Sequence, residues 1–295
     1  MSVRAQFATL PDGRRHFHDG PIDLILEASG PLAARAYDAA ATRFATILDE
    51  LCLELPRLRA ASGGRPEGVV ARRMADAVAP FAESRFLTPM AAVAGAVAEE
   101  ALAAMTEAAP LTRAYVNNGG DIALHLAPGA SFAIGLVARP DRLALFGRAR
   151  ITADNAARGV ATSGWRGRSF SLGVADAVTV IAHTASLADA AATLIANAVD
   201  LPGHPAIRRA PACSRDPQSD LGQRLVTLAV GSLSGDEIAR ALASGAREAE
   251  LWLGRGLIEA AALSLGGRTR LVAADAAPYT LAAPPLSTES RYALG

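Results

Sequence analysis

The chain has 295 residues, 51% of them hydrophobic, and its 29 basic residues balance 29 acidic residues to give a formal net charge of zero. A chain of this length and apolar content can bury a sizeable core, which excludes global disorder. The balanced charge, without a basic stripe, argues against a nucleic-acid partner. Every basic residue is an arginine, which excludes chemistry that needs a lysine, such as a Schiff base or a Walker A loop.

The cysteines and the hydropathy pattern point to a compartment. Cys52 and Cys213 lie far apart and have no CxxC companion, which is typical of a reducing environment. The first residues contain no apolar run suited to a signal peptide, and charged residues interrupt every apolar stretch before the roughly 18 residues that a membrane span needs. We therefore expect a cytoplasmic protein that has no contact with a membrane.

The first third of the chain predicts short strands followed by long helices. The turn signals PDG and DGP separate predicted strands at 3–9, 15–18 and 21–28. An Ala-rich helix is predicted over 31–55, and after a loop at 60–68 two more helices follow at 69–84 and 89–106. Thr88 and Pro89 suit the N-cap and the first position of the last helix.

The predicted helix at 89–106 presents an unusually small face, which we expect to pack near the strand at 175–183. Such a face allows close approach of either a packed neighbour or a ligand, and the sequence leaves both open. The small residues are Ala91, Ala92, Ala94, Gly95, Ala96 and Ala98.

From residue 111 the hydrophobic period changes from that of a helix to that of strands. Strands are predicted at 113–116, 122–126, 131–138 and 142–149, and an apolar strand at 175–183 is expected to be buried on both faces. The helix predicted next, at about 187–199, begins with Ser186 and Asp189 as a candidate capping box.

The last part of the chain begins with a Pro-, Gly- and Arg-rich loop at 200–222, to which the sequence assigns no role. A strand at 225–233, a helix at 235–254 with a capping box of Ser234 and Glu237, and a hairpin at 257–265 and 269–273 follow. This order predicts an α+β fold in which a mixed or antiparallel sheet packs against Ala-rich helices. We expect one compact domain over 1–274 and a mobile tail at 275–295.

Three polar or glycine-rich clusters are candidates for a site. The first is Asn118-Gly119-Gly120-Asp121, between two predicted strands. Asn-Gly and Gly-Gly are favoured in hairpin turns that need positive φ, so this segment is either a plain hairpin or a turn whose backbone approaches a ligand. The second is Thr162-Ser163-Gly164, where hydroxyls and amides either form an ordinary turn or cradle phosphate oxygens.

The third cluster is Asp189 with Thr193, four residues apart and therefore on one face of the predicted helix. A carboxylate and a hydroxyl on an Ala-lined face could hold a hard cation such as Mg²⁺. The alternative is a capping Asp and a Thr bonded to its own helix backbone, and two side chains alone are too few for a metal site.

Taken in order, the clusters resemble the ApbE family of FAD:protein FMN transferases, over about residues 85–200. The motifs that carry the resemblance are Asn118-Gly119-Gly120-Asp121, Thr162-Ser163-Gly164, the apolar segment 178–182, and Ala188-Asp189-Ala190 with Thr193.

The resemblance implies an α+β protein that binds FAD and Mg²⁺ and moves FMN onto a Thr or Ser of a partner protein. It implies that the first two clusters bind the cofactor and that Asp189 and Thr193 are side-chain ligands of Mg²⁺. A backbone ligand is implied near Ala91. No catalytic residue and no oligomeric state are assigned.

The chain departs from the family pattern at two places, which suggests a divergent cytoplasmic branch. Ala94-Gly95 stands where the family has a Lys-Gly pair, and the segment 168–174 replaces one with His, Asp-Pro and Thr-Gly. We expect a protein that handles flavin or a nucleotide, by Mg²⁺-dependent FMN transfer or FAD cleavage. The alternative is a catalytically inactive flavin binder, or a structural or interaction protein, on the same scaffold.

Overall fold

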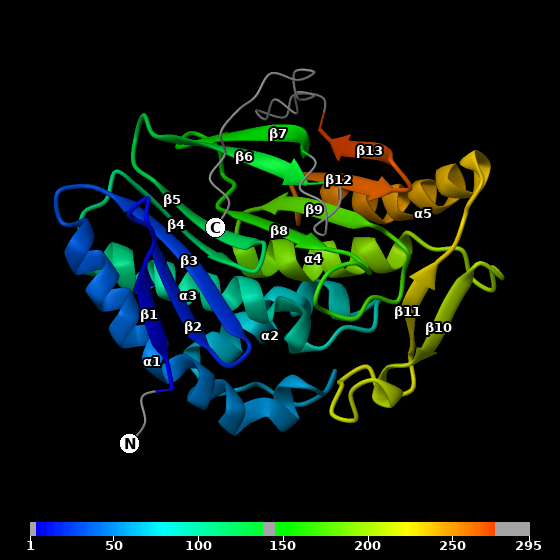
Figure 1. Cartoon of the computed structure of the whole chain (residues 1–295), viewed down its shortest axis with the longest axis horizontal. Coiled ribbons are helices and arrows are strands. Elements are labelled where there is room, and N and C mark those ends of the chain that lie inside the picture. Colours follow the sequence, from blue (N-terminus) through cyan, green and yellow to red (C-terminus); the bar gives the residue numbers. More distant parts are fainter. Residues whose placement is uncertain (1–3, 138–144, 275–295) are drawn as a thin grey trace.

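A computed structural model describes residues 4–137 and 145–274. The predicted mobile tail at 275–295 lies outside the described residues. One nine-stranded sheet runs through the molecule in the order β1-β2-β3-β4-β5-β8-β9-β12-β13, and each neighbouring pair is antiparallel (Figure 1). Its strands are β1 (Gln6–Thr9), β2 (Arg15–Asp19), β3 (Ile22–Ser29), β4 (Arg113–Asn118), β5 (Asp121–Leu126), β8 (Gly159–Ser163), β9 (Ala177–Ala182), β12 (Ala260–Leu265) and β13 (Arg268–Ala273).

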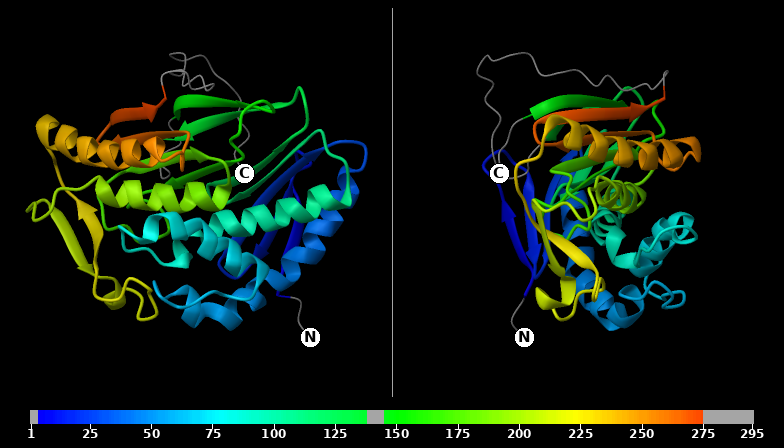
Figure 2. Two further views of the ribbon diagram at one scale, coloured as in Figure 1. Left: turned by 180° about the vertical axis from the view of Figure 1, so that it is seen from behind. Right: turned by 90° about the vertical axis from the view of Figure 1, so that its right-hand side faces the viewer.

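Five α-helices lie together on one face of this sheet (Figure 2). They are α1 (Ala33–Leu58), α2 (Val69–Ala82), α3 (Val93–Ala108), α4 (Ala185–Ala198) and α5 (Gly235–Gly254). A 3₁₀ turn, η1 (Pro89–Ala92), leads into α3. The expected α+β class, with Ala-rich helices packed on an antiparallel sheet, is confirmed.

A hairpin of β6 (Ser131–Val137) and β7 (Leu145–Thr152) covers part of the opposite face. Ile151 of β7 packs in one apolar cluster with Leu124 of β5, Val160 of β8 and Ile181 of β9. Because α4 packs on β8 and β9 from the other side, every residue of β9 is buried. The expected burial of this strand on both faces is therefore confirmed.

Helix α3 packs against α1, α4, β4 and β5, whereas α4 takes the place on β8 and β9 that we had predicted for the small face of α3. At Gly95 the two helices touch through their backbones. A Cβ atom built on Gly95 would lie 2.3 Å from the carbonyl oxygen of Ala185. The small residues therefore serve close helix packing, and α3 still reaches the neighbourhood of Asp189.

Helix starts differ from the sequence prediction in two of three cases. The capping box of Ser234 and Glu237 at α5 is confirmed. Thr88 and Pro89 take the predicted N-cap and first positions, but of the 3₁₀ turn η1, and the Thr88 hydroxyl donates to Asp220 instead of making a capping bond. The predicted box of Ser186 and Asp189 is wrong, because α4 begins two residues earlier than expected, with the Thr184 hydroxyl accepting from the Leu187 amide at 3.2 Å.

Two strands were not expected from the sequence. Thr162 and Ser163 end β8, where the sequence indicated only a turn. Within the expected loop at 200–222 lie β10 (Ile207–Pro211), which pairs with β11 (Leu225–Val230), and a 3₁₀ turn, η2 (Ala212–Ser214).

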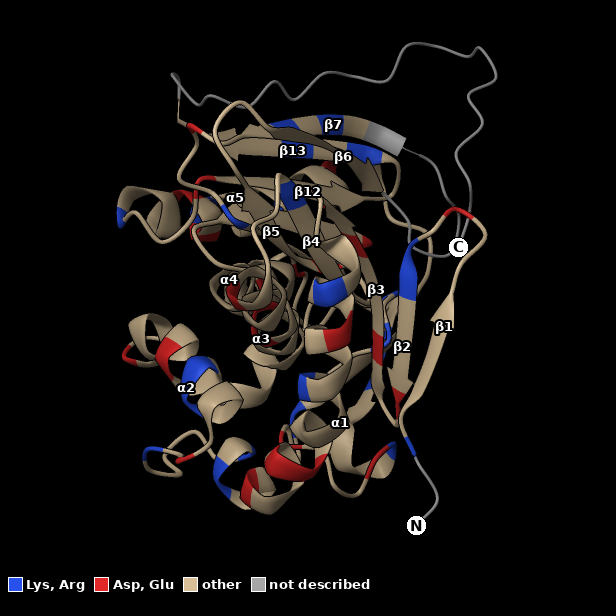
Figure 3. Cartoon of the chain, turned by 90° about the vertical axis from the view of Figure 1, so that its left-hand side faces the viewer, with Lys and Arg blue, Asp and Glu red and all other residues tan. Residues whose placement is uncertain are grey.

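Acidic and basic residues are interspersed on α1 and α2 (Figure 3). No described helix combines the length and the apolar character that crossing a membrane requires.

Candidate functional site

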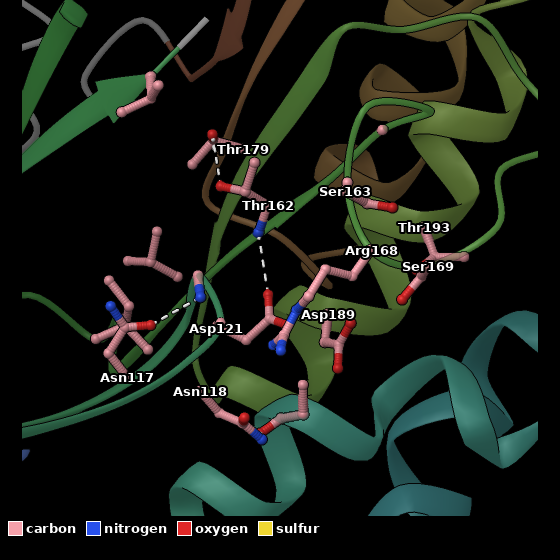
Figure 4. Close-up of a pocket in the computed structure, with 18 of the residues that line it drawn as sticks. Asn117, Asn118, Asp121, Thr162, Ser163, Arg168, Ser169, Thr179, Asp189 and Thr193 are labelled. Carbon is pink, nitrogen blue, oxygen red and sulfur yellow. Dashed lines mark hydrogen bonds between the residues drawn. The ribbon is translucent and has the colours of Figure 1, made fainter. Parts of the chain in front are cut away.

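One cavity of about 660 Å³ gathers all three clusters singled out in the sequence (Figure 4). The β4–β5 turn, the end of β8 and one face of α4 form its walls. Segments more than 70 positions apart in the sequence are therefore neighbours in space. The predicted residues that line the cavity are Asn118, Gly119, Gly120, Asp121, Thr162, Ser163, Gly164, Asp189 and Thr193.

The Asn118–Asp121 segment both closes a hairpin and lines the cavity. Asn118 pairs with Asp121 in the β4–β5 ladder, and Gly119 and Gly120 turn the chain with φ of +65° and +114°. The Gly120 amide donates to Oδ1 of Asn117 at 2.8 Å, and Nδ2 of Asn118 donates to the Ala94 carbonyl at 3.2 Å. The second bond fixes the turn against the first turn of α3.

Asp121 links this turn to β8. Its Oδ1 accepts the Thr162 amide at 3.1 Å, while the Thr162 hydroxyl pairs with the Thr179 hydroxyl at 2.9 Å. The Asp121 side chain is buried. Burial raises the pKa of Asp121 to about 7, although the Thr162 amide and the Arg168 charge both lower it.

Asp189 faces Asp121 from α4. Its Oδ2 accepts the Gly95 amide at 3.1 Å, so the close α3–α4 contact also holds this carboxylate. Asp189 is half-buried, and its exposed part lines the cavity. Burial and the negative charge of Asp121 raise the pKa of Asp189 well above its ordinary range. Because the negative charges of Asp121 and Asp189 repel each other, this wall of the cavity favours the binding of a cation or of a proton.

The oxygen-rich wall fits a hard cation in part. Asp121, Asp189 and Thr193 offer carboxylate and hydroxyl oxygens, the donors that Mg²⁺ prefers, and Mg²⁺ completes its shell with water and phosphate oxygens. Across the described ranges, no three His, Cys, Asp or Glu side chains gather in a metal-binding group. Ala91, the implied backbone ligand, does not line the cavity, whereas Ala94 of the same segment does.

Sequence reasoning missed two further walls of the cavity. Arg166 and Arg168 lie in the segment after β8, where the chain departs from the family pattern, so no motif indicated them. Ile134 and Val137 of β6 add an apolar wall, together with Ile122. The alternation of β6 predicted a strand but not which cavity the strand would border.

The fold and the site define an α+β protein with a carboxylate-bearing cavity where two parts of one sheet meet. The family model described as "AbpE bacteria" matches residues 7–271. The chain therefore belongs to the ApbE family, which confirms the resemblance noted in its sequence.

Similar proteins include archaeal ones of the UPF0280 group. The UPF0280 protein MK0206 of Methanopyrus kandleri is 42% identical over 134 residues, which are 45% of this chain and 50% of the relative. A UPF0280 protein of Methanosphaerula palustris is 39% identical over 140 residues, 44% of this chain and 52% of the relative. The chain thus spans about half the length of these curated relatives.

Among solved structures, the apo form of the Pseudomonas stutzeri flavinyl transferase ApbE aligns with 93% of this chain and 95% of its own. The sequence identity is 12% and the TM-score 0.40.

Proposed function

We propose that this chain binds FAD with Mg²⁺ in the cavity and transfers FMN to a hydroxyl of a partner protein, or cleaves FAD, in the cytoplasm. The observation that carries the proposal is the gathering of the three family-like clusters around one cavity, where Asp121 and Asp189 face each other. A volume of about 660 Å³ falls within the roughly 300–1,000 Å³ that is usual for small-molecule sites.

The two walls suit the two ends of such a ligand. The Gly119-Gly120 turn leaves room for phosphate oxygens to approach the backbone, because no atom lies within 4 Å of a Cβ built on Gly120. Ile134 and Val137 suit an apolar ring. Asp189 and Thr193 would hold Mg²⁺, which when bound would neutralise charge that develops on the phosphates.

In the proposed transfer, an acceptor hydroxyl oxygen bonds to the phosphorus of the FMN half, and the bond from that phosphorus to the bridging oxygen breaks. AMP leaves with the bridging oxygen, and the hydroxyl proton passes to a base. In FAD cleavage, water takes the place of the hydroxyl. No histidine lines the cavity in the described part of the chain, so Asp121, which need not coordinate the metal, is the candidate base.

A second candidate function is flavin binding without transfer. The absence of histidine in the described lining and the replacement of the family's His and Asp-Pro segment favour it.

Incubation of the purified protein with FAD, with and without Mg²⁺ and a Thr-containing acceptor protein, separates the two. Chromatography that finds AMP only with Mg²⁺ supports the enzyme. Bound FAD without AMP supports the binder, and no FAD binding contradicts both.

A further inference from the structure

Two arginines line the cavity, and the structure engages them differently. The Arg166 Nε atom donates to Asp176 at 2.6 Å, and its guanidinium lies 4.4 Å from the centre of the Trp165 ring. Arg168 has neither a hydrogen bond nor an ion pair with any residue that the structure describes, although its charge reaches Asp121. Arg166 is thus held by a carboxylate, whereas no residue in 4–137 or 145–274 occupies the donors of Arg168.

The position of Arg168 depends on a glycine. A Cβ atom built on Gly119 would lie 2.1 Å from Nη2 of Arg168, so the guanidinium lies directly over the turn that borders the cavity. Figure 4 shows the Arg168 side chain extending toward Asp121. Any larger residue at position 119 would force the guanidinium to move.

An anionic ligand in this cavity needs a cationic side chain nearby. Asp121 and Asp189 repel an anionic ligand, and the chain contains no lysine to offset them. A guanidinium presents paired N–H donors that match two phosphate oxygens, and such charge-assisted pairs are about twice as strong as neutral hydrogen bonds. Arg168 lies over the Gly119-Gly120 turn and has no hydrogen-bonded partner among the described residues, so its guanidinium is placed to bind a phosphate in the cavity.

We propose that Arg168 binds a phosphate of a diphosphate-bearing ligand and fixes the diphosphate over the Gly119-Gly120 turn. The assignment rests on the proposed function for the identity of the ligand as FAD, but the anion contact itself can be tested without a flavin.

The test is calorimetric titration of inorganic diphosphate and of FAD, each with Mg²⁺, into the wild type, Arg168→Gln and Arg208→Gln. Arg208 is an exposed arginine on β10 outside the cavity lining and is the matched control. We expect Arg168→Gln to bind both probes about 10- to 100-fold more weakly, and Arg208→Gln to match the wild type. Equal affinities in all three proteins would overturn the proposal.

The outcomes also distinguish this proposal from the proposed function. Diphosphate binding that needs Arg168, without FAD binding, keeps the assignment of Arg168 and contradicts the flavin function. A wild type that binds neither probe contradicts both. FAD binding that is insensitive to Arg168→Gln contradicts the role of Arg168 alone.

A second variant guards against a merely structural role of Arg168. Gly119→Ala should displace the guanidinium and weaken diphosphate binding in the wild-type background, but should add little loss to Arg168→Gln. A similar loss in both backgrounds would mean that the turn, and not the arginine, binds the anion, and would overturn the proposal.

Discussion

Asp189 lies in the second turn of α4, because this helix begins two residues earlier than the sequence predicts, and this position decides its role. A Ser-x-x-Asp sequence fits both a capping box and a cavity-lining carboxylate, so the sequence alone cannot choose. In the structure Thr184 caps the helix, and Asp189 instead accepts the Gly95 amide across the α3–α4 contact. The carboxylate is therefore held by a neighbouring helix and directed to the cavity.

The same contact predicts that Gly95 tolerates no side chain. In Gly95→Ala the new Cβ would lie 2.3 Å from the Ala185 carbonyl oxygen, which forces α3 and α4 apart. We expect a loss of about 1–3 kcal/mol in the free energy of unfolding, measured by urea denaturation.

Gly254→Ala at the end of α5 is the matched control, because no atom lies within 4 Å of the added Cβ. Alanine is favoured over glycine in a helix by up to about 1 kcal/mol, so this variant should be at least as stable as the wild type. Equal stability of the Gly95→Ala variant and the wild type would contradict the close helix contact.

At the scale of single elements, the start of α5 predicts a dependence of stability on pH. Glu237 accepts the Ser234 amide at 2.7 Å, and its Oε1 lies 2.9 Å from Nε2 of His204. The Ser234 amide, followed by His204, lowers the pKa of Glu237 from 4.5 to about 2. The folded state therefore favours the charged form, and this stabilisation is present above pH 4.5 and is lost as pH falls toward 2.

We accordingly expect Glu237→Gln to be less stable than the wild type at pH 7, and the difference to shrink when urea unfolding is repeated at pH 3. A difference that is independent of pH would show that the carboxylate charge contributes nothing to the cap.

Most elements were predictable, and the exceptions have physical causes. The spacing of apolar residues and the turn residues located the helices and most strands, because the residues that set this spacing are the ones that pack in the core. Strand β8 was not predicted, since Gly159-Val160-Ala161 carries a weak strand pattern between glycines, and its pairing with β5 and β9 is long-range. The role of Arg168 was not predictable either, because Arg168 and Gly119 are far apart in the sequence and only the fold brings them together.

At the scale of the whole molecule, the cavity lies where two parts of the sheet join. The strands β1 to β5 connect to β8, β9, β12 and β13 through the short β5–β8 ladder, in which Ile122 pairs with Val160. The bonds Asp121–Thr162 and Gly95–Asp189 cross the same junction. The residues that line the cavity thus come from both parts.

This continuous sheet leads us to expect that residues 1–274 unfold as one unit. Trp165 follows β8 and Trp252 lies in α5, so tryptophan fluorescence reports on the second part of the fold, whereas far-ultraviolet circular dichroism reports on all elements. The urea midpoints of the two signals should coincide. Two separated transitions would mean that the parts are independent domains.

We propose above all that the Asp189 carboxylate holds Mg²⁺ for FAD in this cavity. FAD should be titrated into the wild type and Asp189→Asn, each with and without Mg²⁺, after circular dichroism has verified that the variant is folded. We predict tight binding only in the wild type with Mg²⁺, because asparagine preserves the shape of the side chain but removes its charge. Equal affinities in all four mixtures, or no FAD affinity in any of them, would contradict the account.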